Sequence, residues 1–198
     1  MRAHMALKYS GQKIILREVE LDNLPAEALA VSEHATVPSL VISEDKFLDE
    51  SWDIAKWAIQ QHDPDNWAGK NNEYLQEAEM LVETNDYSFQ EDLGHYQHAE
   101  DHPQHPVEYY RQRCEEFLEE LNGMLEQQNF LLADTVTIAD IAVFPFIREF
   151  VRVDQHWFEE SPYQALQRWF FYLLDTQWYA EASRKYDIWE SASDDVYL

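Results

Sequence analysis

Only four of the 198 residues are glycine, and this scarcity constrains the fold more than any other feature of the sequence. An average protein has about 7% glycine, much of it at turns that need a positive φ. A fold with many tight turns, such as a β-sandwich, is hard to build with so few. The sequence therefore predicts that helices dominate. Apolar residues make up 45% of the chain and aromatic residues 14%, enough to bury a core in one large domain or two small ones.

Acidic side chains outnumber basic ones by 39 to 14, which gives a formal charge of −25. A surface of this sign is repelled by phosphate backbones and anionic lipid, so we expect neither a nucleic-acid nor a membrane partner. The single cysteine, Cys114, excludes a disulfide framework and a multi-cysteine zinc site, and it suits a reducing compartment. No apolar run approaches the roughly 18 residues that a membrane span needs. These features predict an acidic cytoplasmic protein.

The chain divides by pattern into a mixed front part and a helical rear part. Residues 1–62 alternate short segments in the order helix, strand, helix, strand, strand, helix, which is an α/β arrangement. A polar linker follows at 63–72, and residues 73–190 have the spacing of helices throughout. The final residues, 191–198, form an acidic tail that we expect to fray.

One helix of the rear part is strongly amphipathic. Its apolar residues recur at intervals of three and four, which places them on one face. The face consists of Tyr110, Cys114, Phe117, Leu118, Leu121, Met124 and Leu125. We therefore expect this face to be buried in a helical bundle, with Cys114 in a structural role.

The segment Val136–Ile141 carries the most specific local signal. Thr137 lies where a helix N-cap belongs, and Asp140 follows three residues later, where its side chain can reach back to the cap amide. Val136 and Ile141 are spaced as a hydrophobic staple. We interpret Thr137 and Asp140 as a structural cap of a buried helix, not as catalytic residues.

Two short motifs in the front part have both an ordinary and a functional interpretation. Val37-Pro38 opens a strand after a polar loop, and taken alone it is most simply a trans strand start, although a cis bond is common at such positions. Glu50-Ser51 precedes a helix, where exposed amides and a hydroxyl can bind a carboxylate. Taken alone, Ser51 is most simply a helix cap.

The combination of these features resembles the glutathione transferase family, from Arg2 to about Trp189. The segment Leu132–Ile147 is especially similar to bacterial members. The resemblance implies a mainly α fold with a small α/β part, namely a thioredoxin-like domain followed by an all-α bundle. It implies glutathione as a cosubstrate with no other cofactor, a small electrophilic or disulfide second substrate, and a possible homodimer.

The resemblance also assigns roles to residues. Val37 would offer its main chain to the cysteinyl unit of glutathione, with the bond to Pro38 cis. Glu50 would hold the ammonium of the γ-glutamyl end, and Ser51, at the helix start, would hold its carboxylate. The predicted glutathione-binding residues are therefore Val37, Pro38, Glu50 and Ser51.

The sequence departs from the family pattern at its beginning. Family members start with a β-strand, then a Tyr, Ser or Cys that stabilises or reacts with the glutathione sulfur. Here Met1 already lies within the first helix, so the thioredoxin-like domain is incomplete and no catalytic residue is assigned. We expect that residues precede Met1 in the native protein; a degenerate front domain is the alternative. For this chain we predict weak glutathione binding with little conjugation or thiol–disulfide exchange, or else a non-catalytic interaction or regulatory role.

Half of the eight histidines lie within eleven residues, at His95, His98, His102 and His105. Imidazole beside carboxylate can bind zinc or nickel, and Glu100 is close by. However, prolines at 103 and 106 favour an irregular, solvated loop between helices, in which nothing makes the rings converge. We therefore predict no metal site, while a weak or a physiological one stays open.

Overall fold

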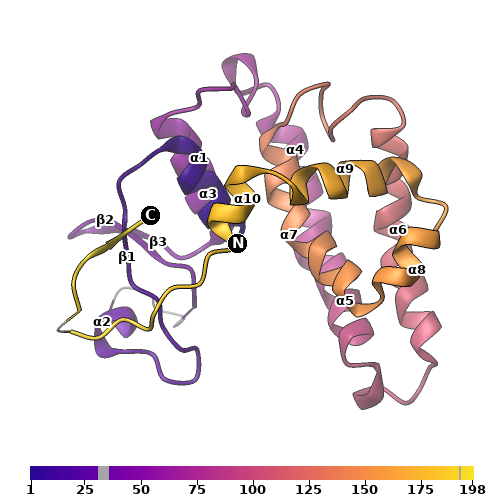
Figure 1. Cartoon of the computed structure of the whole chain (residues 1–198), viewed down its shortest axis with the longest axis horizontal. Helices are drawn as coiled ribbons and strands as arrows, with labels where there is room; N and C mark the ends of the chain where they lie inside the picture. The colour runs from indigo at the N-terminus through magenta and orange to yellow at the C-terminus, as the bar shows by residue number, and fades with distance from the viewer. Residues whose placement is uncertain (31–35, 192) are drawn as a thin grey trace. The chain divides into compact units, whose positions relative to one another are not determined.

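The computed structural model describes residues 1–30, 36–191 and 193–198 and divides into two compact units (Figure 1). The first unit combines residues 1–65 with 177–198, and the second comprises residues 66–176. Both ends of the chain therefore belong to the first unit. Residues 177–190, which the sequence pattern assigns to the helical part, are clustered with the front part instead.

The first unit is built around helix α1 (Arg2–Ser10), which packs against α3 (Ser51–Gln61) and α10 (Gln177–Ala182). Small buried side chains allow this close packing, among them Ala3 and Ala6 on α1 and Ala55 and Ala58 on α3. Helix α1 ends at Gly11, whose φ of 64° is the left-handed conformation that favours glycine at this position. A short helix, α2 (Ala26–Leu29), follows the first strand of the chain and precedes the second.

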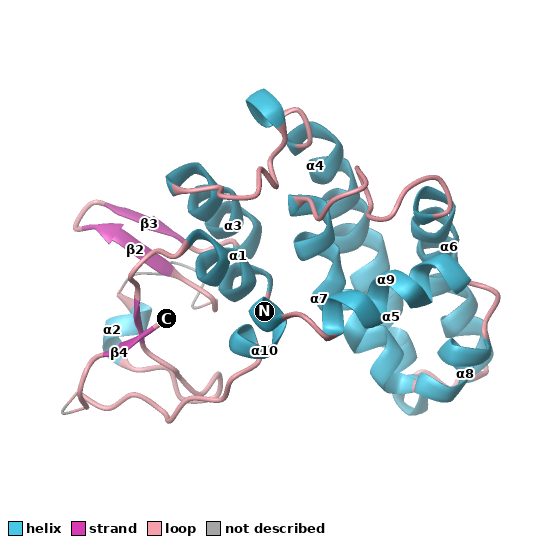
Figure 2. Ribbon diagram, turned by 45° about the horizontal axis from the view of Figure 1, so that its top comes forward, coloured by secondary structure: helices cyan, strands magenta, loops and turns pink. Residues whose placement is uncertain are grey.

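The strands of the first unit form two separate antiparallel pairs (Figure 2). Strand β2 (Leu40–Ser43) pairs with β3 (Lys46–Leu48) in a hairpin. Strand β1 (Ile15–Leu16) pairs with β4 (Val196–Tyr197), which comes from the other end of the chain.

The prediction that the acidic tail frays is therefore wrong. Leu198 donates its amide to the Ile14 carbonyl at 2.9 Å, and Trp189 donates to the Glu18 carbonyl at 2.8 Å. Tyr197 also lies under the Lys13 ammonium, 4.3 Å from the ring centroid. The C-terminal segment thus supplies the β1 backbone with hydrogen-bond partners.

The second unit is helical throughout its regular structure. In chain order it contains the 3-10 helix η1 (Lys70–Asn72), α4 (Leu75–Thr84), the π-helix η2 (Asn85–Phe89), α5 (Gln90–Gln97), the 3-10 helix η3 (Ala99–Asp101), α6 (Val107–Leu125), α7 (Ile138–Val153), α8 (Gln155–Glu160) and α9 (Gln164–Leu174). Helix α7 is the centre of the core and contacts α4, α5, α8 and α9.

The predicted face of α6 is buried, as its periodicity indicates. Tyr110, Cys114, Phe117, Leu118, Leu121 and Leu125 are all shielded from solvent, and Met124 is half-buried. Helix α6 packs on α5 and α9 through this unit's interior. In the described part of the chain, no helix is long and apolar enough to cross a membrane.

Candidate functional site

The β2–β3 hairpin brings the two predicted site segments to the same end of the first unit. The pairing of Leu40 with Leu48 is the last at that end. Because the strands are antiparallel, the residues preceding Leu40 and those following Leu48 leave the ladder at the same end. The segments Val37-Pro38 and Glu50-Ser51 therefore emerge together, one entering β2 and the other leaving β3.

The Val37–Pro38 peptide bond is cis, the conformation that the family resemblance implies. Val37 is exposed over 43% of its surface, so its surroundings are open to a ligand. The turn is braced locally by the Ser39 hydroxyl, which donates to the Thr36 carbonyl at 2.8 Å. This arrangement presents the main chain around Val37 at the edge of the hairpin.

Glu50 and Ser51 lie at the N-terminus of α3. Glu50 is the N-cap residue, with extended dihedrals of −102° and 129°, and its carbonyl accepts the first intrahelical bond from Ile54 at 3.0 Å. Neither motif residue caps the helix with its side chain, so Ser51 is not the cap that the simpler interpretation predicts. The first-turn amides of α3 lack intrahelical partners and carry the positive end of the helix dipole, which favours an anion there.

Arg2 lies beside the predicted site residue Ser51, and the sequence interpretation missed it. Its side chain is only 2% exposed, and its Nη1 donates a hydrogen bond to the Ser51 Oγ at 3.3 Å. A guanidinium beside the α3 N-terminus adds positive charge where a carboxylate is expected to bind. One signal in the sequence could have revealed it: Arg2 lies four residues before Ala6, on the apolar face of α1.

Thr137 and Asp140 form the capping box that the spacing predicts at the start of α7. Asp140 Oδ2 accepts from the amide and the hydroxyl of Thr137, both at 2.7 Å. Its Oδ1 accepts from the Leu131 amide at 2.9 Å and from Trp169 Nε1 at 2.7 Å. Burial raises the pKa of Asp140, and these four hydrogen bonds oppose that rise. The carboxylate joins a loop, a helix start and a second helix inside the second unit.

The Cys114 thiol and the Tyr9 hydroxyl are potential nucleophiles, but their surroundings keep both in the protonated form. Cys114 is fully buried, and this burial raises the pKa of its thiol to about 12, so the thiolate is not available near neutral pH. The Tyr9 hydroxyl donates to Asp63 at 2.6 Å and accepts from the Asp65 amide at 2.7 Å. Burial, and then the bond to Asp63, raise the pKa of Tyr9.

Two open hollows lie elsewhere in the described residues. One in the first unit encloses about 280 Å³ between Tyr9, Pro64 and Trp178. The other, in the second unit, encloses about 270 Å³ between Phe130, Arg168 and Tyr172. Neither is lined by the predicted glutathione-binding residues, which lie instead around the end of the hairpin.

Comparison with known families identifies both parts of the chain. Residues 1–67 match the family model described as glutathione S-transferase, N-terminal domain. Residues 76–170 match the model described as glutathione S-transferase, C-terminal domain. No curated protein matches the sequence.

Solved structures share the fold at low sequence identity. A ternary complex of BphK, a bacterial glutathione transferase, superposes with a TM-score of 0.74 at 20% identity, over 91% of each chain. A class Gtt2 enzyme of Vibrio parahaemolyticus gives 0.70 at 21% identity, over 91% of this chain and 90% of that one.

A third structure, glutathione S-transferase-I bound with lactoylglutathione, gives a TM-score of 0.73 at 16% identity, over 92% of this chain and 91% of that one. The mainly helical architecture with a small strand part fits a thioredoxin-like domain followed by a helical domain. The chain belongs to the glutathione S-transferase family.

Proposed function

We propose that the chain binds glutathione in the first unit, at the end of the β2–β3 hairpin, and that it has little transferase activity of its own. The proposal is supported by the pairing of Leu40 with Leu48, which brings the Val37–Pro38 segment and the start of α3 to the same end of the hairpin. The structure bound with lactoylglutathione shows that a protein of this fold can hold a glutathione conjugate.

The γ-glutamyl end of glutathione carries one ammonium and one carboxylate, and the site offers a complement to each. The exposed Glu50 carboxylate is suited to the ammonium. The first-turn amides of α3, the Ser51 hydroxyl and the neighbouring Arg2 guanidinium are suited to the carboxylate. Val37 would pair its main chain with the cysteinyl unit, as a short strand pairs with an edge.

The proposed lack of activity concerns the thiol. A transferase lowers the pKa of the glutathione thiol and orients the thiolate toward an electrophile. In the described residues, the start of α1 carries Met1, Arg2 and Ala3 and no hydroxyl or thiol group. Ser51 accepts a hydrogen bond from Arg2, and Cys114 is buried in the second unit. Neither residue is therefore placed to activate the thiol of bound glutathione.

The binding proposal is tested by calorimetric titration of the full chain with reduced glutathione. Ser51→Ala and Glu50→Gln should each weaken binding at least tenfold, because each removes a partner of one charged group. Ser43→Ala and Glu44→Gln are matched controls at the opposite end of the hairpin, both exposed, and should leave the affinity within twofold. Unchanged affinity in both site variants would refute the proposal.

The activity proposal is tested by following conjugation of glutathione to a generic aryl halide. We expect a rate close to that of the uncatalysed reaction, even when calorimetry shows that glutathione is bound. Turnover far above the solution rate would refute this part of the proposal and leave the binding site intact. A folded chain that does not bind glutathione would instead favour a non-catalytic interaction protein on the same fold.

A further inference from the structure

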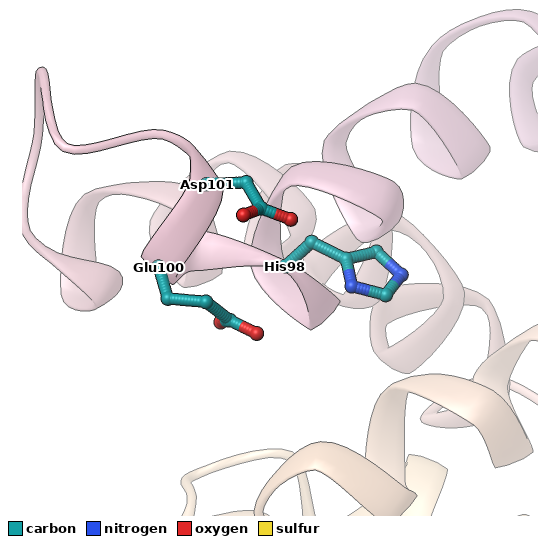
Figure 3. Close-up of side chains that lie close together, drawn as sticks. All are labelled: His98, Glu100 and Asp101. Atoms are coloured by element: carbon teal, nitrogen blue, oxygen red, sulfur yellow. The ribbon is translucent and has the colours of Figure 1, made fainter.

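The turn between α5 and α6 brings together three side chains that are suited to a metal ion. His98, Glu100 and Asp101 are all exposed, and each offers one ligand atom within 4.8 Å of those of the other two. Figure 3 shows the three side chains extending from η3 and its first flanking residue toward a common side. They lie in the second unit, outside the proposed glutathione site.

The backbone explains why these side chains meet. The Asp101 amide donates to the His98 carbonyl at 2.9 Å, which closes one 3-10 turn. This turn brings Asp101 back near His98, and their ligand atoms lie within 4.8 Å of each other. Glu100 lies between Ala99 and Asp101 in the sequence, and its longer side chain reaches the same side.

The other histidines of this cluster have a different role, since they pack on aromatic rings. His95 and His102 meet edge to face with centroids 4.4 Å apart, and both lie within 6.0 Å of the Tyr110 ring. The Tyr110 hydroxyl donates to the His102 carbonyl at 2.8 Å. This packing holds the backbone of the turn on both sides of η3.

His105 is similarly engaged, because it stacks on Tyr109 with ring centroids 4.0 Å apart. His98 is thus the member of the four that stands beside carboxylates. In the described part of the chain, neither Glu100 nor Asp101 has an ion-pair partner. Two carboxylates next to each other without a cation repel, and a bound dication would relieve that repulsion.

We propose that His98, Glu100 and Asp101 form an open surface site for a first-row transition-metal dication, with water completing the coordination. Two ligands of a tetrahedral zinc ion are roughly 3.4 Å apart, so donors within 4.8 Å of one another must close by at most about 1.4 Å, which exposed side chains can do by rotation. One imidazole nitrogen with two carboxylate oxygens favours Zn²⁺, Ni²⁺ or Cu²⁺ over Mg²⁺. The net charge of −25 raises the cation concentration near the surface.

The test is a calorimetric titration of the full chain with Zn²⁺ in a buffer that does not bind metal. We expect one saturable site per chain. His98→Ala, Glu100→Gln and Asp101→Asn should each weaken it at least tenfold, and a tenfold excess of Mg²⁺ should not displace the zinc. Circular dichroism verifies that each variant keeps its helix content.

His156→Ala is the matched control. His156 is also exposed in the second unit, and its Nε2 lies 3.6 Å from a Glu160 carboxylate oxygen, so it offers an imidazole and one carboxylate without the third ligand. This variant should bind zinc within twofold of the wild type. The proposal is overturned if the three site variants bind as well as the control, if Mg²⁺ competes equally, or if binding does not saturate at one ion per chain.

Discussion

The two units of this protein are stabilised in different ways. In the second unit, eleven of the sixteen residues of α7 are buried, and a buried carboxylate ties its start to the surrounding segments. In the first unit, Leu40 is the one buried residue among the four described strands. One of its two sheets pairs the chain's two ends, and its helix α1 packs against α3 and α10. The first unit therefore buries its apolar side chains mainly in its helices, while its strands stay largely exposed.

The largest expected effect is in the second unit. Asp140→Ala removes the acceptor for the Thr137 and Leu131 amides and for Trp169, and leaves those buried donors unsatisfied. We expect a loss of about 3–4 kcal/mol in the free energy of unfolding. Urea unfolding followed by tryptophan fluorescence measures this loss. Glu120→Gln, an exposed change on α6, should cost less than about 0.5 kcal/mol; equal losses in the two variants would contradict the role given to Asp140.

The first unit should be the more sensitive to acid. Burial lowers the pKa of His4 to about 4, below the value near 6.5 expected for an unfolded chain. The unfolded state therefore binds the proton more tightly, and the stability from neutral His4 is complete above pH 6.5 and lost as the pH falls toward 4. We expect a loss of about 2 kcal/mol over this range.

The contribution of His4 is isolated by comparing variants. Urea midpoints at pH 7 and pH 4.5 should differ less in His4→Gln than in the wild type. His156→Gln, at an exposed position of the second unit, should retain the wild-type dependence. An unchanged pH dependence in His4→Gln would show that His4 does not contribute.

A smaller effect is expected where the two chain ends pair. Tyr197→Ala removes the cross-strand neighbour of Ile15 and the ring under Lys13. We expect a loss of about 0.5–1 kcal/mol, confined to the first unit. Hydrogen exchange should become faster at residues 14–18 and stay unchanged in α7. Tyr87→Ala, at a highly exposed tyrosine, is the control, and faster exchange in both variants would contradict a specific role for Tyr197.

The sequence predicted the helical unit well because its helices follow from local rules. The α6 face follows from apolar spacing, and the predicted Thr137–Asp140 cap marks the start of α7. The π-helical turn η2, which separates α4 from α5, has no counterpart among the sequence predictions. A π-helical turn contains one residue more than an α-helical turn, and residue spacing alone does not locate it.

The first unit was predicted less completely because its key contacts are long-range. The pairing of β1 with β4 joins residues about 180 positions apart, and two-residue strands have no readable alternation. Arg2 and Ser51 are likewise distant in sequence, so their hydrogen bond had no local signal beyond a charge on an apolar face. The roles of Val37, Pro38, Glu50 and Ser51 were inferred from a family pattern, and the hairpin register places both segments at the same end of the ladder.

The central claim is that glutathione binds at the hairpin end of the first unit. The most direct test is to titrate the isotope-labelled full chain with reduced glutathione and to follow the backbone amide resonances by NMR. The account predicts saturable shifts concentrated at residues 37 and 39 and at the first turn of α3, with the second unit nearly unaffected. Shifts that are absent from these residues, or that are concentrated in α4–α9 instead, would contradict it.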